Sequence, residues 1–229
     1  MLEDFAKFLW SQFFVLLYLL TWIVSVYRYR RYFDTPLKYL PMLIIYTFFT
    51  ELLGYFIKYS DEFQFFSDSR FAGHNVIIYN VYQLVFFLFF FEVYRKVIKN
   101  RSAKKWIFYG SFLCGLIYLV NALFYNPLHN QLTYAHIVVS FMLASILILY
   151  FKEKRIDGVA QPLKYNLLFW VSAGLLVFYS LFPIILAMYR LKLSVGVYIY
   201  LRPILLSSIV LMYGCFIIGL LAGKRKAFR

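Results

Sequence analysis

Apolar residues in this chain run in long stretches, and short polar segments interrupt them at fairly even intervals. Each stretch spans about 20 residues or more, the length that an α-helix needs to cross a bilayer. The pattern therefore predicts an all-α integral membrane protein, with its 229 residues forming a single seven-helix transmembrane domain. The expected spans are Ala6–Tyr27, Leu37–Tyr59, His74–Tyr94, Lys105–Tyr125, Leu132–Phe151, Leu163–Tyr189 and Val197–Leu221.

Composition supports the membrane interpretation. The chain is 63% apolar and 15% charged, whereas a soluble domain is about 45–50% apolar and about 25% charged. A water-soluble fold of this size could not hide so much apolar surface. We therefore expect a lipid bilayer around the helices and a multi-pass protein of the cell membrane, which is the inner membrane if the source is a Gram-negative bacterium.

The basic residues predict an orientation. Placing the N-terminus outside and the C-terminus inside puts 18 of the 24 lysines and arginines on the inner side, in four segments. Cytoplasmic segments of membrane proteins are enriched in these residues. Contacts with anionic lipid headgroups account for the net charge of +14 without a nucleic-acid partner. The four segments are Arg28–Lys38, Arg95–Lys105, Lys152–Lys164 and Lys224–Arg229.

A tetrapeptide, "PLKY", occurs twice, at Pro36–Tyr39 and at Pro162–Tyr165. The same offset of 126 residues aligns the first three predicted helices with the last three and leaves the fourth as a connector. This spacing predicts a parallel repeat of three, one and three helices, an arrangement found among membrane transporters. The alternative is two independent helices that each begin near a proline, a residue favoured in the first turn.

This arrangement resembles, in outline, that of sugar-transporting SWEET proteins and of microbial rhodopsins. A retinal protein needs a lysine in the middle of its seventh helix to form the Schiff base. The seventh predicted helix, Val197–Leu221, contains no lysine. Covalently bound retinal is therefore excluded, and the sequence predicts no cofactor.

Polar residues inside the predicted helices are the candidates for function, because such groups are costly in lipid and usually face the bundle interior. In the predicted topology they share the outer third of the membrane, which predicts a polar cavity open to the outer face that binds a small molecule. The predicted ligand-binding residues are Gln12, Glu51, Asn80, Gln83, Asn121, His136 and Arg202.

The same residues also fit a structural role. In that interpretation Glu51 and Arg202 form a buried ion pair, and the amides connect helices as hydrogen-bonding groups. Both interpretations predict that Glu51 approaches Arg202, with His136 and Asn80 on the same wall. Glu92, at the other end of its helix, is expected to pair locally with Lys96 four residues later.

Two function classes remain open. One is a receptor or sensor that passes a ligand-induced change to a separate cytoplasmic or membrane partner. The other is a small-molecule transporter built from the two triple-helix repeats. A membrane-embedded enzyme is less favoured, because the three histidines form no H-E-x-x-H run and no serine lies in G-x-S-x-G. No catalytic or metal-binding residue is therefore predicted.

Overall fold

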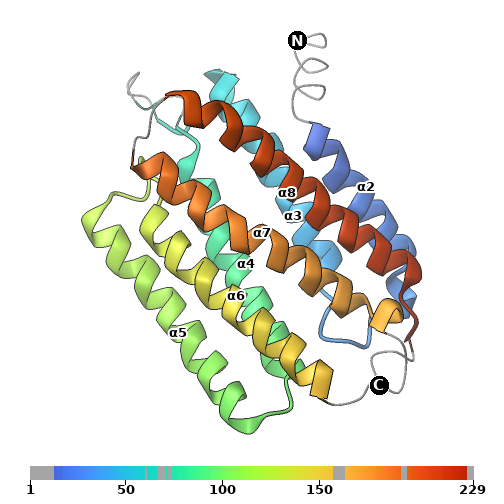
Figure 1. The fold of residues 1–229 in the computed structure, drawn as a ribbon. Coiled ribbons are helices and arrows are strands. Elements are labelled where there is room, and N and C mark those ends of the chain that lie inside the picture. The colour runs from blue at the N-terminus through green and yellow to red at the C-terminus, as the bar shows by residue number, and fades with distance from the viewer. Residues whose placement is uncertain are drawn as a thin grey trace. The chain divides into compact units, whose positions relative to one another are not determined.

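The computed structural model describes residues 13–59, 61–66, 71, 74–156, 163–191 and 195–225. Within these ranges the chain forms seven α-helices and three short 3-10 helices, and no strand (Figure 1). The α-helices are α2 (Phe13–Tyr27), α3 (Leu40–Tyr59), α4 (Val76–Val97), α5 (Arg101–Phe124), α6 (Thr133–Ile156), α7 (Leu167–Arg190) and α8 (Val195–Ala222). The 3-10 helices are η1 (Tyr29–Arg31), η2 (Asp61–Phe63) and η3 (Leu163–Tyr165).

Six of these helices, α3 to α8, are long and apolar enough to cross a membrane. They confirm the predicted all-helical class, and they correspond to six of the seven predicted spans. The remaining helix, α2, is apolar and is described over 15 residues. The first part of its predicted span, from Ala6 to Gln12, lies outside the described residues.

Helix ends differ from the predicted spans where polar residues extend or cap a helix. Helix α5 begins at Arg101, four residues before the predicted start, because the Asn100 side chain caps it by accepting from the Ala103 N–H at 3.1 Å. The predicted sixth span is wrong at its start, since Leu163–Tyr165 is a separate 3-10 helix and α7 follows Asn166. Apolar patterns locate the lipid-crossing part of a helix, whereas caps determine its ends.

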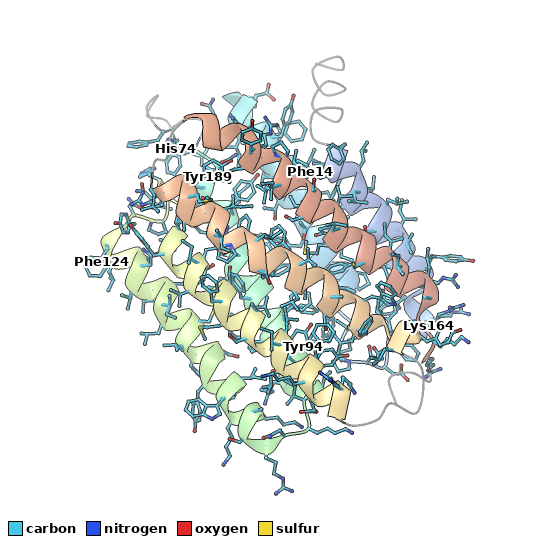
Figure 2. All side chains as sticks on the ribbon, viewed as in Figure 1. Phe14, His74, Tyr94, Phe124, Lys164 and Tyr189 are labelled. Atoms are coloured by element: carbon cyan, nitrogen blue, oxygen red, sulfur yellow. The ribbon has the colours of Figure 1, made fainter. Side chains whose placement is uncertain are left out.

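Helix α5 has a broad exposed apolar face. Trp106, Phe112 and Leu123 are 74%, 67% and 77% exposed, and Phe124 points away from its neighbours at the end of the helix (Figure 2). A contiguous apolar face of this kind is rare on a soluble protein in water. Its natural surroundings are lipid chains, in agreement with the predicted bilayer environment.

The chain divides into two compact units. Unit 1 comprises Met1–Phe48 and Phe151–Arg229, and therefore contains α2, the first part of α3, the end of α6, α7 and α8. Unit 2 comprises Phe49–Tyr150, with the rest of α3, α4, α5 and most of α6.

In unit 1, α8 lies alongside α7 and also contacts α2 (Figure 1). The approach of α7 to α8 is close at two glycines. A Cβ atom on Gly174 would lie 2.7 Å from the Met212 carbonyl oxygen, and one on Gly219 would lie 2.7 Å from the Trp170 Cβ. Small residues at such positions let helix backbones approach in membranes, where dispersion contacts replace the hydrophobic effect between helices.

In unit 2, α4 packs against α5. The buried face of α4 is largely aromatic, and the buried side chains of α5, which are small or medium except for Tyr118, recur at heptad-like spacing. The buried residues of α4 are Asn80, Gln83, Phe86, Phe87, Phe90, Phe91, Val93 and Tyr94, and those of α5 are Ala103, Ile107, Cys114, Tyr118 and Asn121.

Candidate functional site

A carboxyl group inside a membrane-length helix is the most unusual chemical feature of unit 2. Glu51 lies on α3, and its Oε2 accepts a hydrogen bond from the Tyr79 hydroxyl of α4 at 3.0 Å. Ionisable side chains at membrane depth are rare, and they commonly mark a pathway or a binding site. The Glu51–Tyr79 contact is therefore the centre of the candidate site.

Two neighbours fix the geometry of this contact. Gly54 lies three residues after Glu51, and a Cβ atom there would be 2.5 Å from the Tyr79 hydroxyl oxygen. The missing side chain thus provides room for the phenol. Asn75, which precedes α4, donates from Nδ2 to the Gly54 carbonyl at 2.8 Å. Together these residues join α3 to the start of α4.

Asn80 lies one residue after Tyr79, and its amide binds three backbone groups. Nδ2 donates to the carbonyls of Pro127 and Asn130 at 2.8 and 3.0 Å, and Oδ1 accepts from the Leu132 N–H at 3.1 Å. Both amide protons are therefore used. Asn80 therefore connects α4 to the segment between α5 and α6. This is a structural role, in addition to the ligand-binding role that the sequence predicts.

Asn121 makes a similar connection from α5. Its Oδ1 accepts from the Ala135 N–H at 3.0 Å. Ala135 is the third residue of α6, where a backbone donor has no partner within its own helix. The Asn121 side chain thus provides an acceptor for a free backbone N–H in the first turn of α6.

Gln83 and His136 are both buried in unit 2. Gln83 is one turn beyond Asn80 on α4, and its Oε1 is buried without a hydrogen-bond partner among the described residues. The His136 ring packs edge-on against Phe87 of α4, with ring centroids 5.3 Å apart. A buried amide oxygen without a donor costs about 1–3 kcal/mol, so Gln83 is the member of this set best placed to accept a hydrogen bond from a ligand or a water.

Two predicted site residues, Gln12 and Arg202, are not part of the group that the contacts of unit 2 bring together. Gln12 lies outside the described residues. Arg202 belongs to α8 in unit 1 and is exposed. The approach of Glu51 to Arg202 stays a prediction, and the partner that the structure gives Glu51 is Tyr79.

An aromatic cluster in unit 2 joins the segment before α4 to the segment between α5 and α6. The rings of His74 and His129 are 5.8 Å apart, and Phe71 stacks on His129 at 4.0 Å. Among the described residues, no group of three or more histidine, cysteine or acidic side chains could hold a metal ion. Two imidazoles alone are too few for a closed zinc site, which takes four ligands.

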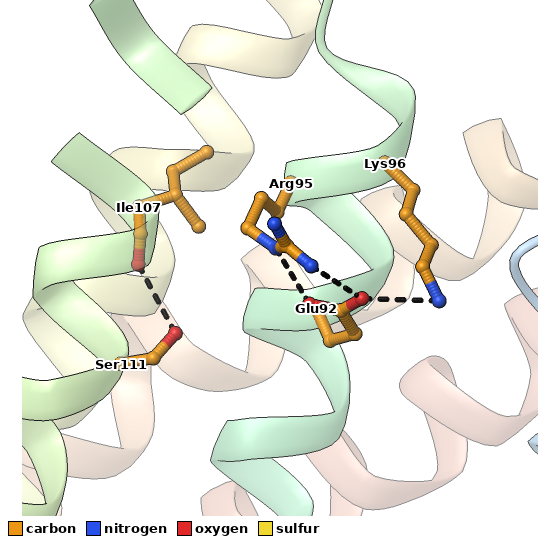
Figure 3. A network of polar contacts seen from close by, with 5 residues as sticks. All are labelled: Glu92, Arg95, Lys96, Ile107 and Ser111. Atoms are coloured by element: carbon orange, nitrogen blue, oxygen red, sulfur yellow. Dashed lines mark hydrogen bonds and ion pairs between the residues drawn. The ribbon is translucent and has the colours of Figure 1, made fainter. Parts of the chain in front are cut away.

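The predicted Glu92–Lys96 pair is confirmed, with a separation of 3.0 Å, and the structure adds a stronger partner. Arg95 donates to both carboxylate oxygens of Glu92, at 2.6 and 2.9 Å (Figure 3). The Arg95 guanidinium also lies 5.7 Å from the ring centre of Phe108 on α5. This network joins the C-terminal end of α4 to the N-terminal part of α5.

Sequence reasoning missed Tyr79 and Asn75 because neither is unusual by type at a helix end. Tyr79 could have been found from its position, because it lies next to the buried-helix candidate Asn80 in the run "IIYNVYQL". It also missed the spacing of Gly219 and Gly223, a small-xxx-small pattern typical of close helix contacts.

No protein-family model, no curated protein and no solved structure matches this chain. Its function is therefore inferred from the chemistry of its own residues.

Proposed function

We propose that this protein is a seven-helix membrane sensor, in which a small molecule binds near Glu51 and a separate cytoplasmic or membrane partner receives the signal. The hydrogen bond from Tyr79 to Glu51 is the observation that carries this proposal. It places an ionisable group and a hydroxyl between two helices of membrane length, where a ligand can compete for either group.

The proposed switch follows from the chemistry of that contact. A cationic or hydrogen-bond-donating ligand would bind Glu51 in place of Tyr79, and the freed phenol would no longer connect α4 to α3. A ligand shifts a protein between two states only by binding one of them better. The two states proposed here differ in the Tyr79–Glu51 hydrogen bond, which is present without the ligand and absent when the ligand binds Glu51.

Continuous helices favour a sensor over a transporter. Transporter sites commonly use helices broken near the midplane in both halves. Here α7 and α8 run without interruption through Pro183 and Pro203, and α3 and α4 contain no proline beyond Pro41 in the first turn of α3.

A transporter of three, one and three helices remains the second candidate, and one observation favours it. Helix α7 begins at Leu167, 127 residues after Leu40 of α3, and α8 ends at Ala222, 125 residues after Val97 of α4. Both offsets lie within one residue of the spacing of the two "PLKY" copies. These two helix ends support the proposed repeat, whereas the opposite ends of the same helices do not, since Arg190 follows Tyr59 by 131 residues and Val195 follows Val76 by 119.

The proposed topology has seven spans in one domain of the cell membrane, with the N-terminus outside and the C-terminus inside. Reporter fusions after Lys58, Arg101 and Arg229 test it. We expect a reporter that needs the outer compartment to be active only at Lys58. Activity of that reporter at Arg229 would contradict the orientation.

The function is tested by comparing a deletion strain with strains that carry the wild-type, Glu51→Gln or Tyr79→Phe protein. For a sensor, deletion should change the transcription of a fixed set of genes, and Glu51→Gln should fail to restore it. Melting in detergent must show that both variants are folded. Tyr109→Phe is the matched control, because Tyr109 is 62% exposed on α5.

A transporter gives a different result in the same strains. Uptake of a labelled nutrient mixture would then fall in the deletion strain and in the Glu51→Gln strain, while transcripts change only as a consequence of starvation. If neither transcription nor uptake responds to Glu51→Gln in a folded protein, the site proposal is wrong.

A further inference from the structure

Three segments of unit 1 meet at one end of its helices. They are residues 28–39, which connect α2 to α3, residues 163–165 of η3, and residues 223–225 after α8, and together they are called the basic end below. Both copies of "PLKY" contribute to it, although Pro162 lies outside the described residues. Lys164 beside the start of α7 marks this end in Figure 2.

The segment after α8 connects the two "PLKY" segments. On one side, the Lys224 N–H donates to the Tyr165 carbonyl at 2.9 Å, and its ammonium lies 4.1 Å from the centre of the Tyr165 ring. On the other side, Arg225 binds Asp34 at 2.9 Å, and Arg31 donates to the Gly223 carbonyl at 3.1 Å. The basic end is therefore a built structure and not three separate loops.

Positive charge at the basic end greatly exceeds negative charge. The three segments contain seven basic residues and one acid, Asp34, which is engaged by Arg225. No ion pair to a described acidic side chain holds the other six basic residues. They are Arg28, Arg30, Arg31, Lys38, Lys164 and Lys224.

One of these cations has a donor that lacks an acceptor. The Nε atom of Arg28 is buried and has no hydrogen-bond partner among the described residues. Arg28 follows the last residue of α2, Tyr27, so it lies where an apolar helix ends. A buried guanidinium N–H without an acceptor is costly, and a phosphate oxygen is an acceptor that matches its geometry.

Helix ends strengthen the attraction for an anion. The N-termini of α3 and α7 both lie at the basic end, and helix N-termini carry partial positive charge. Lys38 and Lys164 lie over the rings of the following tyrosines, at 4.8 and 5.2 Å from the ring centres. Tyrosine and basic residues side by side at the end of a membrane helix are typical of the headgroup layer.

Burial at this end keeps one further group neutral. The Tyr32 hydroxyl donates to the Ser25 carbonyl at 2.7 Å. Desolvation by burial raises the pKa of Tyr32 well above its usual value. A tyrosine is already neutral near pH 7, and burial keeps this phenol neutral at higher pH as well, so it adds no negative charge to oppose an anion.

We propose that the basic end of unit 1 binds the phosphate of an anionic phospholipid, with Arg28, Lys38 and Lys164 as the contacting cations. The bilayer is the source that the structure favours, because Lys38 and Lys164 precede helices of membrane length and Arg28 follows the apolar helix α2. The two "PLKY" segments thus act together as one headgroup site, independently of the proposed sensing site in unit 2.

Lipid binding by the full-length protein in a non-ionic detergent tests the proposal. Native mass spectrometry measures the retention of phosphatidylglycerol and of phosphatidylcholine with the same chains, and competition by inorganic phosphate is measured in a third arm. The site variant is Arg28→Gln, Lys38→Gln and Lys164→Gln combined. The control variant is Arg101→Gln, Lys104→Gln and Lys105→Gln combined, which removes the same charge from α5 in unit 2.

We expect the site variant to lose affinity for phosphatidylglycerol at least about tenfold, since its three cations come from two segments that Lys224, Arg225 and Arg31 join into one site. The control cations lie on one helix outside that site, so the control variant should change by less than about twofold, and phosphatidylcholine binding should be weak throughout. Equal binding of both lipids, an equal loss in the control variant, or full competition by inorganic phosphate at the lipid concentration would each overturn the proposal. If the triple variant does not fold, Lys164→Gln and Lys38→Gln singly must each weaken phosphatidylglycerol binding.

Discussion

In unit 1 the backbones of α7 and α8 approach so closely that Gly174 and Gly219 have no room for a Cβ atom. In unit 2 the prominent connections are side-chain amides that bind backbone groups, as Asn80 and Asn121 do. Both solutions answer the same physical problem. Lipid chains are as apolar as leucine, so helices in a membrane associate through close packing or through hydrogen bonds.

Because the two units are held together by different contacts, they also differ in how easily a ligand could rearrange them. A backbone contact between two helices offers no free polar group that a ligand can compete for, because helical N–H and C=O groups are already paired within their own helices. The hydrogen bonds of unit 2 have donors and acceptors that can exchange partners, as proposed for Tyr79 and Glu51. This contrast suggests rigid packing in unit 1 and a responsive site in unit 2.

The largest expected effect is the loss of close packing in unit 1. In Gly174→Ala the new Cβ would overlap the Met212 carbonyl oxygen, and a backbone atom cannot move aside as a side chain can. We expect destabilisation by about 3 kcal/mol, which is greater than the gain of about 1 kcal/mol in helix propensity. Unfolding in sodium dodecyl sulfate, monitored by circular dichroism, measures the difference.

Gly214→Ala is the matched control on α8, because a Cβ there meets nothing within 4 Å. This variant should be neutral or more stable by up to about 1 kcal/mol. Equal stability of the two variants would show that α7 and α8 are not held by backbone approach.

A smaller loss is expected in unit 2 from Asn80→Ala. The change removes the partners of two carbonyls and one N–H. Water can reach part of this segment, so we expect about 1–2 kcal/mol rather than the full cost of three stranded groups. Gln131→Ala is the control, since Gln131 is exposed in the same segment. Hydrogen exchange should also increase at Leu132 in Asn80→Ala, and unchanged exchange there would contradict the amide's structural role.

The smallest effect is expected at Glu92, although its network is the most conspicuous ionic feature of unit 2 (Figure 3). The side chains of Glu92 and Arg95 are 42% and 39% exposed, so water screens the interaction. Glu92→Gln should cost less than about 1 kcal/mol, and the cost should fall further in high salt. A loss larger than that of Asn80→Ala would mean that ion pairs, and not amides, stabilise unit 2.

Several features could be predicted from the sequence because they depend on neighbours along one helix. The six long helices follow from apolar length, and the Glu92–Lys96 pair follows from a spacing of four residues. Polar residues such as Asn80, Asn121 and His136 were correctly expected to be buried. Their partners were not predictable, because Asn80 binds Pro127, Asn130 and Leu132 about 50 residues away.

The sequence by itself determined that this chain forms apolar helices of membrane length with basic segments between them, since hydrophobicity and helical hydrogen bonds act locally. Only the tertiary structure decided that Glu51 faces Tyr79, that Gly174 lies against Met212, and that the two "PLKY" segments meet through Lys224 and Arg225. Each of these contacts joins residues from different helices or segments. Which of many similar apolar faces pack together depends on shape complementarity between whole helices, and no single helix carries that information.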